Sequence, residues 1–112
     1  MILKKRFLDI NSGNKVLGVY QINDDALDSN NEKKFQKIIS QNINNFDLVI
    51  VSDYGHGLIS TKTANLISRK SKFLALNAQV NAANIGFHSL NKYKNVDCVI
   101  INEKEIRYEL RN

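Results

Sequence analysis

The residues with the clearest chemical potential form the turn 53–57, whose sequence is Asp-Tyr-Gly-His-Gly. A carboxylate at the end of a strand can accept hydrogen bonds from sugar hydroxyl groups, and Asp53 is such a carboxylate. Two glycines separated by one residue, Gly55 and Gly57, let a backbone approach a ligand closely or adopt positive φ. The same residue types are common in tight strand-to-helix turns that serve geometry alone. Both interpretations stay open from the spacing alone.

Two more polar segments follow apolar runs in the same way. Asn77 and Gln79 lie in an Asn-rich stretch, and their amide groups can both donate hydrogen bonds to sugar hydroxyls and accept hydrogen bonds from them. A solvated loop in an Asn-rich protein explains this stretch equally well. Further along, Asn102 and Glu105 have the spacing of a helix N-cap and an acidic residue in the first turn, which is a capping arrangement. These side chains are candidate ligand groups with a structural alternative in each case.

The apolar runs that precede these segments predict the sheet that positions them. Residues 47–52, 73–76 and 97–101 are largely apolar, as strands buried on both faces are, and such strands are usually parallel. Parallel strands bring their carboxyl ends to one edge of a sheet, where α/β proteins bind ligands. We therefore predict that the three polar segments lie at the same edge.

Amphipathic segments predict helices between these strands. Ser29 is followed by Glu32, which has the form of a capping box at the start of the first helix. A second helix is predicted from Ser60 to about Ser71, and a third over residues 103–110. The first is expected to bury Phe35, Ile38, Ile39, Ile43 and Phe46, and the second Ala64, Leu66 and Ile67.

Residues 4–22 are predicted to form a β-hairpin. Residues 11–14 are Asn-Ser-Gly-Asn, which is turn chemistry, and the β-rich run 16–22 follows. Alternating helices and strands then occupy the α/β portion, residues 29–112. The predicted fold class is α/β, with a doubly wound, mainly parallel sheet preceded by the hairpin.

Composition excludes several classes of protein. A chain of 112 residues can be one domain at most, and its 43% hydrophobic content is enough for a real core. The net charge of +5 comes from scattered Lys and Arg, so a nucleic-acid partner is not expected. The apolar runs are too short for a membrane helix and the start does not resemble a signal peptide. A single cysteine, Cys98, with no metal-ligand spacing to His56 or His88, fits a reducing cytoplasm and no direct metal site.

Several of these motifs together resemble the ribokinase (PfkB) family of carbohydrate kinases, in the branch near the heptose-phosphate kinases. Ser-Asp-Tyr-Gly-x-Gly at 52–57 is similar to a loop of those kinases, and the start at 4–8 is similar to their Lys-x-Arg hairpin. Asn102 and Glu105 match the family's Asn-x-x-Glu motif. The stretch 77–86 is similar to a less studied branch whose kinase part often accompanies a sugar nucleotidyltransferase part. The resemblance covers about residues 4–112, the central segment of the family's fold.

The resemblance implies transfer of the ATP γ-phosphoryl group to a sugar or sugar-phosphate hydroxyl. ATP and Mg²⁺ are cofactors of the intact family, and whether this chain binds either stays open. Relatives usually carry Lys where this chain has His56, which leaves the identity of the sugar open. The implied substrate-binding residues are Asp53, Tyr54, Gly55, Gly57, Asn77 and Gln79, and the implied phosphate- or Mg²⁺-associated residues are Asn102 and Glu105.

The family's catalytic base and anion hole belong to a Gly-Ala-Gly-Asp motif, which this sequence does not contain. We therefore expect no catalytic residue here, and no turnover by this chain alone. The alternative function is a non-catalytic α/β binding or assembly module derived from the kinase fold. A sheet from the middle of a larger fold also has free edges, so self-association through exposed sheet edges is expected.

Overall fold

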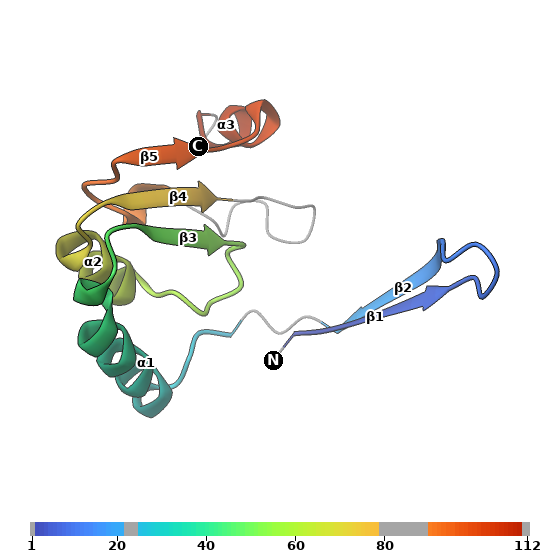
Figure 1. The fold of residues 1–112 in the computed structure, drawn as a ribbon, viewed down its shortest axis with the longest axis horizontal. Coiled ribbons are helices and arrows are strands. Elements are labelled where there is room, and N and C mark those ends of the chain that lie inside the picture. Colours follow the sequence, from blue (N-terminus) through green and yellow to red (C-terminus); the bar gives the residue numbers. More distant parts are fainter. Residues whose placement is uncertain (1, 22–24, 79–89, 111–112) are drawn as a thin grey trace.

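The computed structural model describes residues 2–21, 25–78 and 90–110 (Figure 1). It is an α/β structure with a parallel sheet and a separate antiparallel hairpin. In chain order the elements are β1 (Leu3–Leu8), β2 (Lys15–Gln21), α1 (Ser29–Asn42), the 3-10 turn η1 (Ile43–Asn45), β3 (Val49–Asp53), α2 (Thr61–Lys70), β4 (Leu74–Ala78), the 3-10 turn η2 (Leu90–Lys92), β5 (Cys98–Ile100) and α3 (Glu103–Leu110).

The parallel sheet has the strand order β3-β4-β5. Val51 of β3 lies opposite Leu76 of β4, which in turn lies opposite Val99 of β5. The prediction that these three segments are parallel neighbours is therefore confirmed. The expectation of burial on both faces is wrong for β3 and β5, because both lie at edges of the described sheet. β3 leaves Ile50 exposed, and the short β5 leaves Val99 and Ile100 exposed.

Helix α2 covers one face of this sheet. Side chains alternate along a strand, so Val51, Leu74 and Leu76 share the face that packs against Ala64 and Ile67. Both of these α2 residues are buried, as the periodicity predicts, whereas Leu66 is half-buried. The Ser60 side chain caps α2 by accepting a hydrogen bond of 3.1 Å from the Thr63 backbone N–H. The core therefore lies between α2 and the sheet.

The predicted capping box of α1 is wrong. The N-cap is Asp28, whose carboxylate accepts hydrogen bonds from the backbone N–H groups of Asn30 and Asn31, each at 3.0 Å. The Glu32 carboxylate instead accepts a hydrogen bond from the Ser60 hydroxyl. An aspartate one residue earlier can cap the same helix, and this leaves Glu32 free to tie the first turn of α1 to the start of α2.

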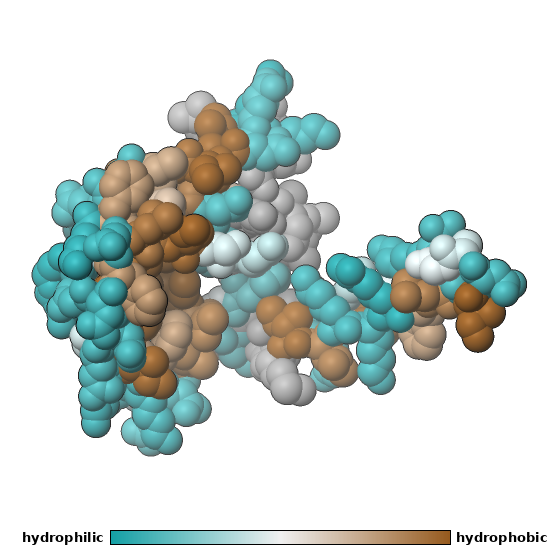
Figure 2. Space-filling view, in the orientation of Figure 1, coloured by the Kyte–Doolittle hydropathy of each residue, from teal (hydrophilic) through white to brown (hydrophobic). Residues whose placement is uncertain are grey.

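The apolar face of α1 is only partly buried. Of its predicted core residues Ile43, in η1, is buried, but Ile38 is 60% exposed and Phe46 is 56% exposed. These side chains, with Leu48 and Ile50 at the free edge of β3, line an apolar groove of about 450 Å³. Figure 2 shows apolar side chains gathered on the surface of the body in the region of the sheet. The helix thus forms where the pattern predicts it without closing its face against the sheet.

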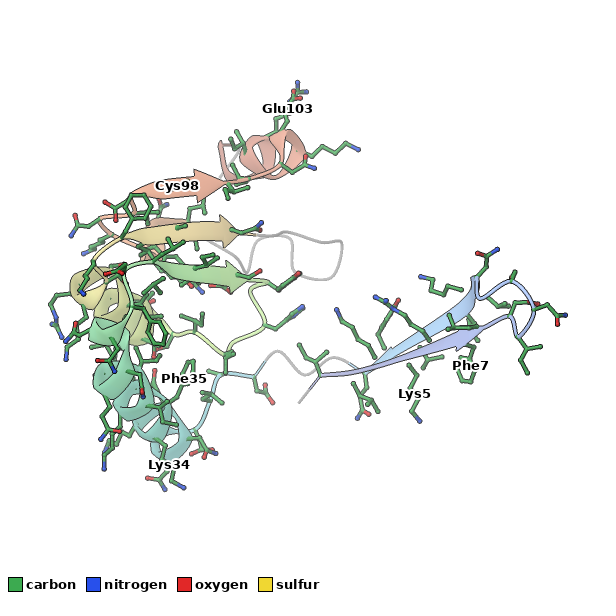
Figure 3. The ribbon with its side chains drawn as sticks, in the orientation of Figure 1. Lys5, Phe7, Lys34, Phe35, Cys98 and Glu103 are labelled. Atoms are coloured by element: carbon green, nitrogen blue, oxygen red, sulfur yellow. The ribbon has the colours of Figure 1, made fainter. Side chains whose placement is uncertain are left out.

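The hairpin β1–β2 projects away from the body (Figure 1). Its turn is fixed by Asp9, whose Oδ1 accepts hydrogen bonds from the backbone N–H groups of Asn11 and Ser12 at 2.9 and 2.8 Å. Almost every hairpin residue is exposed, and Lys5 and Phe7 project from the same side of β1 (Figure 3). The sequence prediction of a hairpin at 4–22 is confirmed for the residues up to 21. None of the helices in the described ranges is long and apolar enough to cross a membrane.

Candidate functional site

The parallel register brings the ends of β3, β4 and β5 to one edge of the sheet. Asp53 lies opposite Ala78, and Ser52 lies opposite Asn77, so the first two candidate segments leave adjacent strands at the same height. Asn102 follows β5, which is separated from β3 by β4, about 10 Å at ordinary strand spacing. The predicted common edge is confirmed for these segments.

Asp53 lies at the centre of a buried polar cluster. The residue is only 5% exposed, and its Oδ2 accepts a hydrogen bond of 2.5 Å from the Tyr93 hydroxyl. The Lys92 Nζ lies 2.7 Å from the same oxygen. The other carboxylate oxygen accepts a hydrogen bond of 2.8 Å from the backbone N–H of Gly55. Both oxygens are therefore engaged within the protein before any ligand arrives.

The electrostatics of the cluster favour a charged Asp53 beside a neutral Tyr93. Burial is the largest influence on the Asp53 carboxyl and raises its pKa, but hydrogen bonds from Lys92, Tyr93 and Gly55 outweigh burial and bring the pKa below its ordinary value. Burial and the neighbouring carboxylate raise the pKa of the Tyr93 phenol far above its ordinary range. Over a wide pH range the neutral phenol therefore donates a hydrogen bond to a carboxylate that stays ionised.

The turn after β3 adopts the conformation that its glycines permit. Gly55 and Gly57 have φ values of 71° and 85°, in the left-handed region that favours glycine. Tyr54 is partly exposed, and its ring centroid lies 5.9 Å from the Lys4 Nζ of the hairpin. The same ammonium lies 6.0 Å from the ring centroid of Tyr20. Tyr54 is thus the point at which the hairpin reaches the edge of the sheet.

The side chains of Asp53 and Asn77 leave the sheet on opposite faces. Asp53 shares the α2 face with Val51, and Ala78, its partner in β4, is fully buried on that face. Asn77 precedes Ala78 by one residue and therefore projects to the other face, where it is half-buried. One edge thus carries the two polar groups, with their side chains on opposite faces of the sheet.

Asn102 caps α3. Its Oδ1 accepts a hydrogen bond of 2.9 Å from the backbone N–H of Lys104, and its backbone carbonyl accepts one of 3.1 Å from Ile106. Helix capping, the structural alternative for the Asn-x-x-Glu motif, is therefore present at Asn102. The side chain of Glu105 and the whole of Gln79 lie outside the described residues.

Lys92 and Tyr93 are the site residues that the sequence did not reveal. Tyr93 is 6% exposed, and its hydroxyl donates a hydrogen bond to Asp53. The alternation of side chains along β3 could have indicated such a partner. It places Asp53 on the same buried face as Val49 and Val51, and a buried carboxylate needs a hydrogen-bond donor. Which donor, some 40 residues away, could not be read from the pattern.

A direct metal site does not form among the residues seen here. Within the ranges 2–21, 25–78 and 90–110, no group of three or more His, Cys, Asp or Glu side chains could hold a metal ion. The Asn102 amide oxygen, which the resemblance associates with phosphate or Mg²⁺, already accepts the hydrogen bond that caps α3.

Comparison of the chain with known protein families, with curated protein sequences and with solved structures found no significant match. The function therefore has to be inferred from the edge of the parallel sheet and from the residues that the structure places there.

Proposed function

We propose that this chain is part of an ATP-dependent carbohydrate kinase of the ribokinase (PfkB) type, with a sugar or sugar phosphate as the acceptor of the γ-phosphoryl group. The observation that supports this proposal best is the parallel register of β3, β4 and β5. It sets the Asp-Tyr-Gly-His-Gly turn, Asn77 and Asn102 at the edge where α/β sheets bind ligands. These are the segments in which the sequence resembles those kinases.

In this proposal the turn 53–57 is the sugar-binding loop. Asp53 is buried with both oxygens engaged, so its main contribution is to fix the turn by accepting the Gly55 N–H. Gly55 and Gly57 carry no Cβ atom and adopt positive φ, so a hydroxyl group can approach the main chain at these two positions. The exposed ring of Tyr54 offers an apolar surface beside that approach.

Binding and turnover are separate claims. Phosphoryl transfer depends on a base and on a preorganised site for the charge of the transferred group. Neither is supplied by the Asp53 cluster, because its carboxylate is hidden and already paired with Lys92. The proposal therefore expects the 112-residue chain to bind its acceptor without phosphorylating it.

Isothermal titration calorimetry with glucose 6-phosphate and with glucose as probes tests the proposal. Asn77→Ala removes an amide at the ligand edge and is expected to weaken binding of the better probe about tenfold, as the loss of one or two hydrogen bonds does. Asn45→Ala is the matched control, because this exposed residue lies in η1, before β3 and at the other end of the sheet. Equal heats for both variants, or no heat with either probe, would refute sugar binding at this edge.

A non-catalytic binding or assembly module is the second candidate. The apolar groove beside α1 and the exposed hairpin favour it, because both leave apolar surface on the outside. The module predicts concentration-dependent association with no response to either sugar probe. Because the chain is expected to self-associate under either candidate, the calorimetric titration with glucose 6-phosphate and glucose separates them, with saturable heat for the kinase segment and none for the module.

A further inference from the structure

The Lys92 ammonium contacts both ends of the loop that joins β3 to α2. At the start of the loop its Nζ lies 2.7 Å from Asp53 Oδ2, and near the end it donates a hydrogen bond of 3.0 Å to the Ile59 carbonyl. The next residue, Ser60, caps α2. A single cation in η2 thus bridges the two points at which the loop leaves and rejoins regular structure.

Tyr93 strengthens the same arrangement from the core. Its ring belongs to the hydrophobic cluster with Val51 and Leu76, and its hydroxyl binds Asp53 Oδ2 at 2.5 Å. The ring is therefore fixed by packing while the hydroxyl fixes the carboxylate. Since the other Asp53 oxygen accepts the Gly55 N–H, the position of the turn follows from the position of the carboxylate.

The cluster is shielded from water, so its contacts are stronger than those of a surface pair. The side chain of Lys92 is 17% exposed and that of Asp53 is 6% exposed. By contrast, the surface pair of Lys72 and Asp47 is 57% and 100% exposed, and such pairs contribute little. Removing one partner of the buried pair leaves the other charge without compensation.

We propose that Lys92 and Tyr93 are positioning residues that hold the loop 53–59 in one conformation, Lys92 by bridging its two ends and Tyr93 by fixing the Asp53 carboxylate. The role of this loop in binding sugars rests on the proposed function, whereas the bridge itself does not. Neither residue is assigned a contact with substrate.

Amide hydrogen exchange followed by NMR on the full chain measures the bridge directly. Lys92→Met keeps the aliphatic stem and removes the charge, and we expect exchange of the Gly55, Gly57 and Leu58 amides to rise at least tenfold relative to amides in β4. Lys94→Met is the control, because this neighbouring lysine is exposed. Lys92→Arg, which can still reach two acceptors, is expected to restore at least part of the protection.

Tyr93→Phe is the second variant and keeps the ring in the core. It is expected to raise exchange at Gly55 with a smaller effect near Ile59, because it loosens one end of the loop only. If exchange rises equally in the loop, α2 and β4 in both variants, the residues merely stabilise the fold and the proposal is overturned. It is also overturned if loop exchange in Lys92→Met equals that in Lys94→Met.

Titration of the same samples with glucose 6-phosphate separates this proposal from the proposed function. If wild type binds the probe, Lys92→Met should raise Kd at least tenfold and Lys94→Met should not. A raised loop exchange in a protein that binds no sugar phosphate supports the bridge and contradicts the proposed function. Unchanged loop exchange in Lys92→Met, in a protein that binds the probe, supports the proposed function and contradicts the bridge.

Discussion

At the scale of single residues, the main finding is that Asp53 is held by the protein rather than presented to solvent. Its carboxylate is fully engaged by Lys92, Tyr93 and the Gly55 N–H. From the sequence, a carboxylate at the end of a strand suggests a ligand-binding group. In the structure, the Asp53 carboxylate is bound by groups of the protein itself. Under the proposed function, a ligand would therefore be contacted by the main chain of the turn and by Tyr54 rather than by Asp53.

Asp53→Asn tests the energetic importance of the buried pair. The substitution leaves the Lys92 ammonium with no counter-charge in a largely buried position, and breaking such a pair costs about 3–5 kcal/mol of unfolding free energy. Urea unfolding at pH 7 measures this loss. Asp47→Asn breaks an exposed pair and should leave the midpoint nearly unchanged. Equal midpoints for the two variants would contradict a buried, functional ion pair.

The pH dependence of stability follows from the two shifted groups. The pKa of Asp53 is lowered on folding, so its contribution is present above the ordinary carboxyl pKa of 3.8 and is lost as the pH falls through the lower folded value. The pKa of Tyr93 is raised, so its contribution is present below about pH 10 and is lost at higher pH. The stability difference between wild type and Asp53→Asn should therefore be largest between about pH 4 and pH 10. Unfolding curves at pH 3, 7 and 10.5 measure it, and a difference that grows below pH 4 would contradict this assignment.

At the scale of elements, the pattern of the sequence predicted the strands and helices well and their ends less well. The hairpin, three parallel strands and three helices form where the periodicity places them. The N-cap of α1 is Asp28 rather than the predicted Ser29, because either of two adjacent residues can cap a helix and sequence spacing does not decide between them. The burial of α1 could not be predicted, because an apolar face shows only that a helix can be covered, not that it is.

Ser60→Ala tests the junction of α1 and α2. The Ser60 hydroxyl caps α2 and also donates to Glu32 of α1, so its removal should cost about 1–2 kcal/mol of unfolding free energy. Ser29→Ala is the matched control and would be damaging only if the capping box predicted from the sequence were real. Thermal unfolding of both variants measures the difference, and a larger loss in Ser29→Ala would contradict the observed caps.

At the scale of the whole molecule, much apolar surface is exposed to solvent. The molecule, hairpin included, extends over 47 × 33 × 27 Å. The hairpin projects away from the body, and two-stranded hairpins are marginally stable alone. Free strand edges at β3 and β5 add to this surface in the described part of the sheet. Candidate site residues could be placed on one edge from the sequence, because parallel order follows from apolar runs. Their faces and their partners depend on tertiary packing, as Asp53 and Tyr93 show.

The purified chain should therefore self-associate and bind a dye for exposed apolar surface. Ile50 is 68% exposed beside the apolar groove at the edge of β3, so Ile50→Lys should reduce both dye fluorescence and the sedimentation coefficient at high concentration. Leu58→Lys places the same charge on an exposed apolar residue of the loop and should have a smaller effect. A monodisperse wild-type monomer with a cooperative melt at high temperature would contradict this prediction.

The central claim of the proposed function is that one edge of the parallel sheet binds a sugar or a sugar phosphate. Chemical-shift mapping of the ¹⁵N-labelled chain during titration with glucose 6-phosphate tests it most directly. The account predicts saturable shifts of the backbone amides in the turn 53–57 and at Asn77, with those of Val49 and Leu74, at the other ends of the same strands, unaffected. Absence of saturable shifts, or shifts centred on Val49 and Leu74, would contradict it.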